Sequence, residues 1–233
     1  MKICTICARG GSKGVKNKNI REIKGHPLIY FTVKQALDSK LFDVVAVSSD
    51  SAEILEEAKK AGAHCLIKRP DELATDTSAK LPVIQHAVTK AEEFLGKKAD
   101  ILVDLDCTSP LRNVQDIKNA VELLISTGAP NVITGAAARR SPYFNLVEMK
   151  ADGTVALAKK LEKTVVRRQD APQCFDMNAS IYVWSREGLF DSQSALREGT
   201  RIYVMPEERS LDIDSELDFQ IVEFLMSKRE DLK

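Results

Sequence analysis

Short apolar runs alternate with amphipathic stretches along roughly the first 135 residues of the chain. The apolar runs predict strands at 2–8, 43–48, 63–68, 101–106 and 131–136, and the amphipathic stretches predict helices at 26–39, 51–61, 79–94 and 114–127. Strands that are apolar nearly throughout and alternate with helices indicate a mostly parallel sheet covered on both faces. The expected fold class is therefore α/β, with three layers.

The alternation is interrupted over residues 139–172. Two β-prone runs, 143–149 and 154–161, flank the turn sequence Ala151-Asp152-Gly153. We expect a protruding hairpin, or arm, inserted into the domain.

The alternation then resumes, with strands expected at 179–184 and 201–205 and a closing helix at 216–228. Ser215 and Asp218 have the spacing of a helix cap just before that helix. Because no repeat or low-complexity linker divides the chain, residues 1–233 are expected to form a single domain.

Composition excludes several classes of protein without naming an activity. The 34 Lys and Arg balance the 34 Asp and Glu, which argues against a nucleic-acid partner. No apolar run approaches the ~20 residues of a membrane helix, and the N-terminal stretch is too short for a signal peptide. Five scattered cysteines are typical of a reduced protein, so we expect a cytoplasmic location.

The loop after the first predicted strand is unusually basic. It carries five positive side chains and no acid, namely Arg9, Lys13, Lys16, Lys18 and Arg21. Glycines at 10, 11 and 14 permit close approach of the backbone to an anion, and the loop follows the carboxyl end of a strand. The loop predicts phosphate binding, although a solvated connection stays open. The glycine spacing fits neither a Walker A loop nor G-x-G-x-x-G.

Two pairs of aspartates have the spacing of carboxylates on one face of an extended segment. Asp212 and Asp214 suit Mg²⁺ shared with substrate phosphates, although Asp214 or Ser215 could equally cap the last helix. Asp104 and Asp106 indicate a substrate site, a second metal site or a solvated strand end.

Cys4 and Cys7 are spaced like a redox or zinc motif. In a strand, however, residues three apart face opposite sides, and no second pair completes a zinc site. Plain strand cysteines are the better interpretation. The isolated histidines His26, His64 and His86 indicate neither a metal cluster nor a catalytic triad.

Further motifs occur in order along the whole chain. They are Ala8-Arg9-x-x-Ser12-Lys13-Gly14 with Lys18-Asn19, Val47-Ser48-Ser49-Asp50, Lys68-Arg69-Pro70-x-x-Leu73-Ala74-x-Asp76-Thr77, Thr108-Ser109-Pro110-Leu111-Arg112 and Asp212-Ile213-Asp214-Ser215-Glu216-Leu217-Asp218. Together they resemble the motifs of the acylneuraminate cytidylyltransferases, the CMP-sialic acid synthetases.

The resemblance implies a nucleotide-diphospho-sugar-transferase-like (Rossmann-like) fold and a homodimer formed through the arm, which would reach the partner's site. It implies a reaction in which CTP and a nine-carbon α-keto acid sugar give the CMP-sugar and pyrophosphate, with Mg²⁺ or Mn²⁺ as the cofactor. Neither nucleic acid nor membrane is an expected partner.

The resemblance also implies roles for individual residues. The nucleotide would contact Ala8, Arg9, Gly10, Ser12, Lys18, Asn19, Arg69 and the backbone near Ser78, and Asp212 and Asp214 would hold the metal. The sugar would contact Asp106, Ser109, Arg168, Gln169, Asp176 and Asn178. Arg9, Lys18 and Asp214 are the expected catalytic residues. No histidine is placed as a base, so deprotonation by an acid or by metal-bound water stays open.

Two departures from the sialic acid pattern bear on the substrate. Asp106 replaces a common Gln, and Asp176 replaces a common Arg before the later asparagine. Two carboxylates at these positions should weaken recognition of an acidic or N-acyl group on the sugar. They should favour a sugar that carries hydrogen-bond donors or a cation. The run from Arg140 to Glu148, with that from Phe175 to Tyr182, resembles most the CMP-legionaminic acid synthetase branch, which serves flagellin or surface-glycan decoration in bacteria.

Three alternatives stay open. The first is an N-acetylneuraminate cytidylyltransferase, which catalyses the same reaction on a different sugar. A non-catalytic nucleotide-binding protein belongs to a different class, and the retention of both Asp212 and Asp214 speaks against it. A 3-deoxy-octulosonate or hexose-phosphate nucleotidyltransferase fits the loop at 12–14 poorly.

Overall fold

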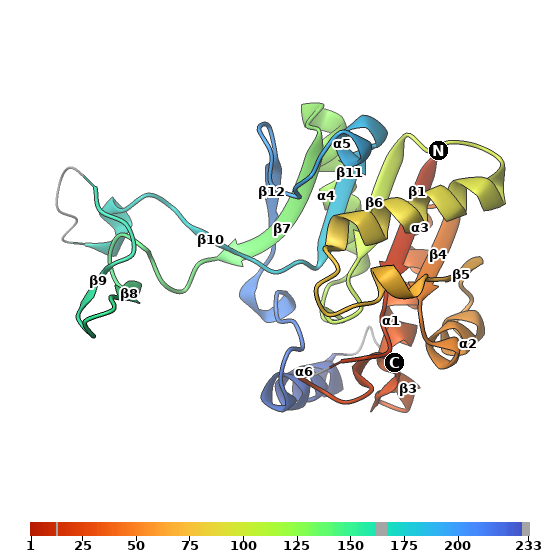
Figure 1. The fold of residues 1–233 in the computed structure, drawn as a ribbon, viewed down its shortest axis with the longest axis horizontal. Helices are drawn as coiled ribbons and strands as arrows, with labels where there is room; N and C mark the ends of the chain where they lie inside the picture. The colour runs from red at the N-terminus through yellow and green to blue at the C-terminus, as the bar shows by residue number, and fades with distance from the viewer. Residues whose placement is uncertain (13, 162–166, 230–233) are drawn as a thin grey trace.

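The computed structural model describes residues 1–12, 14–161 and 167–229 (Figure 1). Within them, one sheet has the strand order β10-β7-β11-β6-β1-β4-β5, with β12 paired to β7. Its strands are β1 (Lys2–Cys7), β4 (Val44–Ser49), β5 (Cys65–Lys68), β6 (Ile101–Leu105), β7 (Asn131–Ala137), β10 (Phe175–Met177), β11 (Ile181–Ser185) and β12 (Arg201–Val204). β1, β4, β5 and β6 are parallel, as is β12 to β7, whereas β10 and β11 are antiparallel to their neighbours. The mostly parallel α/β sheet predicted from the sequence is confirmed.

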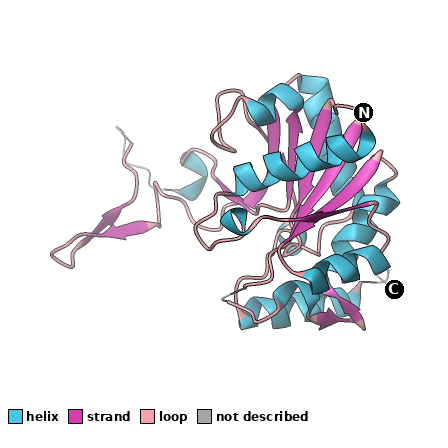
Figure 2. Cartoon of the chain, turned by 45° about the vertical axis from the view of Figure 1, so that its right-hand side comes forward, coloured by secondary structure: helices cyan, strands magenta, loops and turns pink. Residues whose placement is uncertain are grey.

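Helices cover both faces of this sheet (Figure 2). They are α1 (Leu28–Ser39), α2 (Ala52–Lys60), α3 (Lys80–Leu95), α4 (Val114–Thr127), α5 (Arg186–Phe190) and α6 (Glu216–Lys228). Buried residues of α1, α2, α4 and α6 share one hydrophobic core, and those of α3 and α5 form the core on the other face. The three-layer arrangement follows, because each face of an apolar sheet must be covered.

Side-chain caps fix where two helices begin. Asn113 and Asp116 form a capping box at the start of α4, which the sequence analysis did not predict. Ser215 and Asp218 form the predicted one at the start of α6. By contrast, α1 begins two residues later than predicted, because His26 and Pro27 form the short strand β3, paired with β2 (Glu22–Ile23). None of the helices in the described ranges is long and apolar enough to cross a membrane.

The first strand separates its two cysteines as its alternation requires. Cys4 packs into the core under α1, whereas Cys7 packs against the core under α3, and both are free thiols. Burial, together with the nearby Asp104 carboxylate, raises the pKa of each thiol well above its usual value. The interpretation as plain strand cysteines is confirmed.

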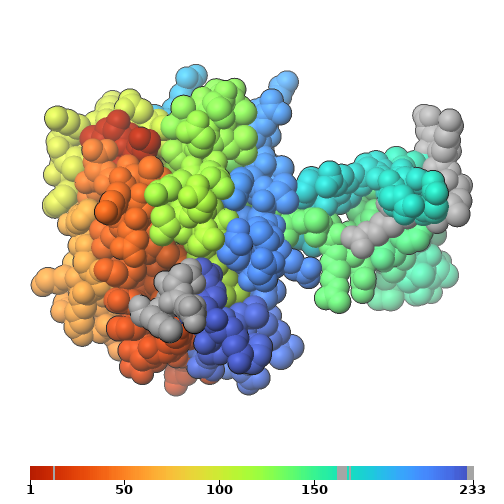
Figure 3. Space-filling model, turned by 180° about the vertical axis from the view of Figure 1, so that it is seen from behind, coloured from red at the N-terminus to blue at the C-terminus, as the bar shows by residue number. Residues whose placement is uncertain are grey.

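A two-stranded hairpin of β8 (Val147–Met149) and β9 (Val155–Leu157) stands away from the body of the molecule (Figures 1 and 3). Its turn contains Gly153 with φ of +81°, a conformation that glycine adopts without strain. The strands are shorter than predicted, because the carbonyl of Ser141 accepts hydrogen bonds from the N–H groups of residues 144–146 and forms a turn there. Residues 162–166, also in the arm, lie outside the described residues.

Candidate functional site

The basic loop and the aspartate pair are in direct contact, although 200 positions separate Gly14 from Asp214 in the sequence. A β-carbon added to Gly14 would lie 2.0 Å from the carbonyl oxygen of Asp214. Only glycine permits this close approach of the two backbones. The fold therefore places the cations predicted to bind phosphate beside the carboxylates predicted to bind a metal.

Lys18 reinforces this contact through its side chain. Its ammonium donates a hydrogen bond to the carbonyl of Ile213 and lies 3.6 Å from Asp214 Oδ1. Next to it, buried Asn19 donates from Nδ2 to the carbonyl of Arg9 at 2.9 Å, which holds the loop back on itself. Lys18 is thus positioned between the loop and the aspartates. The Asn19 side chain, by contrast, already donates a hydrogen bond within the loop.

Arg9 and Gly10 use part of their hydrogen-bonding capacity within the protein. The guanidinium of Arg9 lies 2.6 Å from Asp76 Oδ1, and the N–H of Gly10 donates to Asp50 Oδ1 at 2.9 Å. The N–H of Ser12 donates to the Gly10 carbonyl at 3.1 Å. These two N–H groups face protein acceptors, so the cationic side chains are the better candidates to meet a phosphate. Ala8 is buried at the start of the loop, and Lys13 lies outside the described residues.

Arg69 and Ser78, predicted to contact the nucleotide, come from the segments after β5 and before α3. Arg69 is buried, and its Nη2 donates to the Ser48 carbonyl at 2.8 Å, which fixes the guanidinium at the end of β4. The Ser78 hydroxyl lies 2.7 Å from Thr75 Oγ1 and shapes the turn before α3. Both residues therefore sit at the carboxyl ends of the strands, where open α/β sheets bind ligands.

The side chains of Asp212 and Asp214 do not cap the last helix. Asp218 Oδ2 accepts the N–H groups of both Asp214 and Ser215, so the cap of α6 is made by Ser215 and Asp218. Asp212 is half-buried, and burial together with the Asp214 carboxylate raises its pKa. A divalent cation relieves this repulsion, and carboxylate oxygens are its preferred ligands. In the described ranges, no cluster of three or more His, Cys, Asp or Glu side chains forms a ready-made metal cage.

The second aspartate pair is bridged by a lysine that the sequence motifs did not single out. Lys80 Nζ lies 2.8 Å from Asp106 Oδ2 and 3.5 Å from Asp104 Oδ2, which confirms that the two carboxylates share a face. Asp104 is buried, so the solvated strand end is excluded. An ammonium between the two carboxylates also argues against a second metal there. The only sequence signal for Lys80 was a lysine at the expected start of a helix.

The carboxylate of Asp106 is already paired within the protein. Its Oδ1 accepts both the N–H and the hydroxyl of Thr108, at 3.0 and 2.9 Å, and its Oδ2 accepts from Lys80. Burial opposes its charge, but Lys80 and the Thr108 donors outweigh it and lower the pKa of Asp106. Position 106 therefore presents an internally paired carboxylate beside a cation.

Asp176 and Asn178 reach the same region as Asp212. They line a hollow of about 290 Å³ together with Arg139 and Asp212. Asn178 is buried, and its Oδ1 accepts from Thr134 Oγ1 at 2.7 Å, so its amide holds the bend between β10 and β11. Asp176 Oδ2 accepts the Arg139 N–H at 3.2 Å and stays at the rim of the hollow.

The remaining predicted sugar residues are not brought together within one chain. Gln169 lines a different hollow of about 520 Å³ at the base of the arm, with Arg140 and Pro172. The side chain of Arg168 lies outside what the structure describes, and its backbone belongs to the 3-10 helix Arg168–Asp170. Ser109 is fully buried, and its hydroxyl has no hydrogen-bond partner among the described residues.

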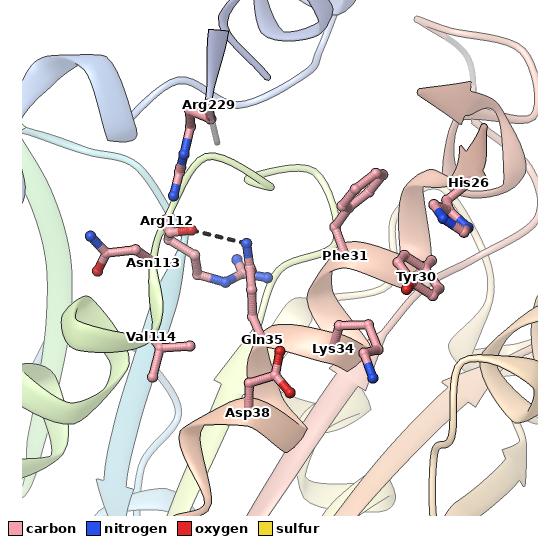
Figure 4. A pocket seen from close by; sticks show the side chains of 10 residues that line it. All are labelled: His26, Tyr30, Phe31, Lys34, Gln35, Asp38, Arg112, Asn113, Val114 and Arg229. Carbon is pink, nitrogen blue, oxygen red and sulfur yellow. Dashed lines mark hydrogen bonds between the residues drawn. The ribbon is translucent and has the colours of Figure 1, made fainter. Parts of the chain in front are cut away.

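A third cavity of about 130 Å³ lies between α1 and the start of α4 (Figure 4). It is lined by His26, Tyr30, Phe31, Lys34, Gln35, Asp38, Arg112, Asn113, Val114 and Arg229. Gln35 Nε2 donates to the Arg112 carbonyl at 2.9 Å and closes its inner wall. None of the site residues predicted from the sequence lines this cavity, so it is not part of the candidate site.

Comparison with known proteins gives the family. The profile of the family described as "Cytidylyltransferase" matches residues 3–222. The chain is 46% identical over 227 residues to the post-translational flagellin modification protein B of Campylobacter coli, covering 97% of this chain and 95% of that one. It is 48% identical over 225 residues to the CMP-N,N′-diacetyllegionaminic acid synthase of Campylobacter jejuni, covering 97% and 94%.

More distant relatives share part of their length or the fold alone. The N-acylneuraminate cytidylyltransferase of Oncorhynchus mykiss is 34% identical over 221 residues, which are 94% of this chain and 48% of that one. The solved structure of CMP:2-keto-3-deoxy-manno-octonic acid synthetase complexed with CTP superposes with a TM-score of 0.69 at 17% identity, over 97% of this chain and 98% of that one. That likeness agrees with the mostly parallel sheet and its covering helices.

Proposed function

The chain belongs to the cytidylyltransferase family, and on this premise we propose that it activates a nine-carbon α-keto acid sugar with CTP. The products are the CMP-sugar and pyrophosphate. The observation that carries the proposal is the contact between Gly14 and Asp214, which joins a phosphate-binding loop to a pair of carboxylates. The identities of 46% and 48% to the two Campylobacter relatives support N,N′-diacetyllegionaminate, or a derivative, as the sugar.

The charges at the site suit this reaction. The anomeric hydroxyl of the sugar attacks the α-phosphorus, so negative charge grows on the phosphoryl oxygens and on the departing pyrophosphate. Arg9 and Lys18 supply positive charge where it develops, and both are already held in place by protein partners. Positioning of the two substrates supplies most of the remaining acceleration.

Asp212 and Asp214 fit a divalent cation, Mg²⁺ or Mn²⁺, because they supply carboxylate oxygens and the cap of α6 is made by other residues. Burial and the neighbouring carboxylate also raise the pKa of Asp212. When bound, such a cation supplies charge neutralisation at the triphosphate. Lys18, beside Asp214, is a protein side chain that also neutralises negative charge on the triphosphate.

The sugar subsite is proposed at the hollow lined by Asp176, Asn178 and Arg139, next to Asp212. The arm extends away from the body and carries exposed apolar side chains, which suit a homodimer interface. In such a dimer, Arg168 and Gln169 would meet the sugar in the partner's site. A CTP-dependent reaction also suits a cytoplasmic location. Flagellin or surface-glycan decoration is the proposed use of the product, since one relative is named as a flagellin modification protein.

The test is pyrophosphate release by the purified protein from CTP and Mg²⁺ with N,N′-diacetyllegionaminate, N-acetylneuraminate or pseudaminate. Preference for legionaminate supports the whole proposal. Preference for N-acetylneuraminate keeps the reaction and overturns the substrate. CTP binding without pyrophosphate release from any sugar overturns the catalytic proposal in favour of a nucleotide-binding protein. Replacing CTP by ATP, GTP or UTP tests the choice of nucleotide.

A further inference from the structure

Lys80 is a cation at the carboxyl edge of the sheet that the catalytic proposal does not use. It is the first residue of α3, two positions after Ser78, and its side chain reaches the end of β6. There Nζ lies 2.8 Å from Asp106 Oδ2 and 3.5 Å from Asp104 Oδ2. The ring of Tyr182, on β11, flanks the ammonium with its centroid 4.6 Å away. Two carboxylates and one aromatic ring therefore define where this charge lies.

The two carboxylates are committed to protein groups. Asp104 is 1% exposed, and its Oδ1 accepts the hydroxyl of Thr5 at 2.8 Å. Asp106 accepts from Thr108 through one oxygen and from Lys80 through the other. Asp104 Oδ2 has no hydrogen-bond partner among the described residues, but it is buried and lies 3.5 Å from the lysine. Because Asp104 is buried and Asp106 is turned towards protein donors, the part of this cluster left for a ligand is the ammonium.

The ammonium retains capacity for a further bond. It has three N–H donors, of which one is satisfied by Asp106 at hydrogen-bond distance. The Lys80 side chain is 36% exposed. Asp106 accepts the N–H of Thr108, and the Thr108 carbonyl accepts the N–H of Ile213, which lies between the two proposed metal ligands, at 3.0 Å. The cluster therefore borders the proposed metal region. On its other side, Lys80 follows the turn at Ser78, whose backbone is expected to contact the nucleotide.

We propose that Lys80 is a specificity-determining residue that donates a hydrogen bond to an anionic oxygen of a substrate, with Asp104 and Asp106 as positioning residues. The inference rests on the proposed cytidylyl transfer. A sugar carboxylate and a phosphate of CTP offer the same chemistry to an ammonium, and the kinetic test separates them.

Holding the lysine in place is the physical advantage of this cluster. A free lysine loses rotamer entropy when it binds, whereas one fixed by two carboxylates has lost it already. Burial opposes the charge of Lys80, but Asp106 and Asp104 outweigh it and raise its pKa, so the ammonium stays protonated at neutral pH.

The test compares steady-state pyrophosphate release by wild type, Lys80→Met, Lys80→Arg and the control Lys90→Met. Lys90 lies on the same helix and pairs only with Glu93, on the exposed surface among the described residues. Lys80→Met is expected to raise KM for one substrate about tenfold or more, with partial recovery in Lys80→Arg. A raised KM for CTP assigns the phosphate, and a raised KM for the sugar assigns its carboxylate. Lys90→Met is expected to match wild type.

Removing Lys80 alone leaves two carboxylates unbalanced, which can unfold the protein. Thermal unfolding is therefore followed for each variant, and Lys80→Met combined with Asp106→Asn keeps the cluster balanced if the single variant fails to fold. Unchanged KM values for both substrates in a folded variant overturn the inference, whatever kcat does. A wild-type protein that releases no pyrophosphate overturns the proposed function itself, and the inference with it.

Discussion

The backbone of Gly14 packs against the carbonyl oxygen of Asp214, and a β-carbon at position 14 would lie 2.0 Å from that oxygen. This contact holds the two halves of the candidate site in register. Its consequences can be tested residue by residue.

Replacing Gly14 by alanine should push the loop away from the aspartates. We expect kcat/KM for pyrophosphate release to fall by about a hundredfold, because small displacements of charged groups are costly to catalysis. Thermal unfolding should also shift downwards, since the extra methyl group has no room. Gly11→Ala is the matched control, because a β-carbon there meets nothing within 4 Å. An equal effect on the melting temperature in both variants would contradict the role of the contact.

Asp214→Asn should remove most turnover while keeping the fold. We expect kcat to fall by about a hundredfold or more, with a far-ultraviolet circular dichroism spectrum like that of wild type. The comparison is Asp218→Asn, which alters the cap of α6. That variant should lose some thermal stability and keep most of its activity. Near-normal turnover in Asp214→Asn would rule out its metal and catalytic role.

Arg9→Ala should weaken the use of CTP. We expect KM for CTP to rise about tenfold or more, because a charged hydrogen bond to phosphate is lost. Initial rates at varied CTP and saturating sugar measure this. Lys59→Ala, at an exposed position of α2 outside the loop, is the control and should behave like wild type. If CTP dependence is unchanged in Arg9→Ala, the phosphate role of the loop fails.

The raised pKa of Asp212 predicts a link between pH, metal and stability. Its ionised form is disfavoured in the folded protein by burial and by Asp214, so without metal Asp212→Asn should melt about 2 °C higher at neutral pH. The sign follows because a raised carboxyl pKa costs stability above the folded pKa, and that cost disappears below the unfolded pKa. The gain should therefore vanish as pH falls through the carboxylate range. Mg²⁺ with CTP should raise the melting temperature of wild type, and that of Asp212→Asn less.

The exposed apolar side chains of the arm predict a dimer. Met149 is 77% exposed and Val155 61% exposed, on the two paired strands of the hairpin. We expect Met149→Glu with Val155→Glu to halve the mass measured by light scattering after gel filtration. Leu217→Glu is the control, since Leu217 is 65% exposed on α6 in the body of the protein. A wild-type monomer would exclude the dimer.

Local patterns in the sequence predicted many of the helices and strands and part of the candidate site. Buried strands such as β1, the helix α4 and the cap of Ser215 and Asp218 were all predicted correctly, because apolar periodicity and short-range hydrogen bonds act within a few residues. The basic loop and the pair Asp212 and Asp214 were also recognised from the sequence, because the residues of each lie close together in the chain. Helix α1 was placed two residues early, because the pairing of β3 with β2 overrode the helical periodicity.

What the tertiary structure alone decided are contacts between residues far apart in the chain. The approach of Gly14 to Asp214 and the bridge from Lys80 to Asp104 and Asp106 depend on how strands and helices pack. No residue type or spacing signals such pairs, because each partner on its own looks like an ordinary strand, loop or helix-end residue. The sequence therefore determined which functional side chains are present. Packing determined which of them come into contact and which are already hydrogen-bonded within the protein.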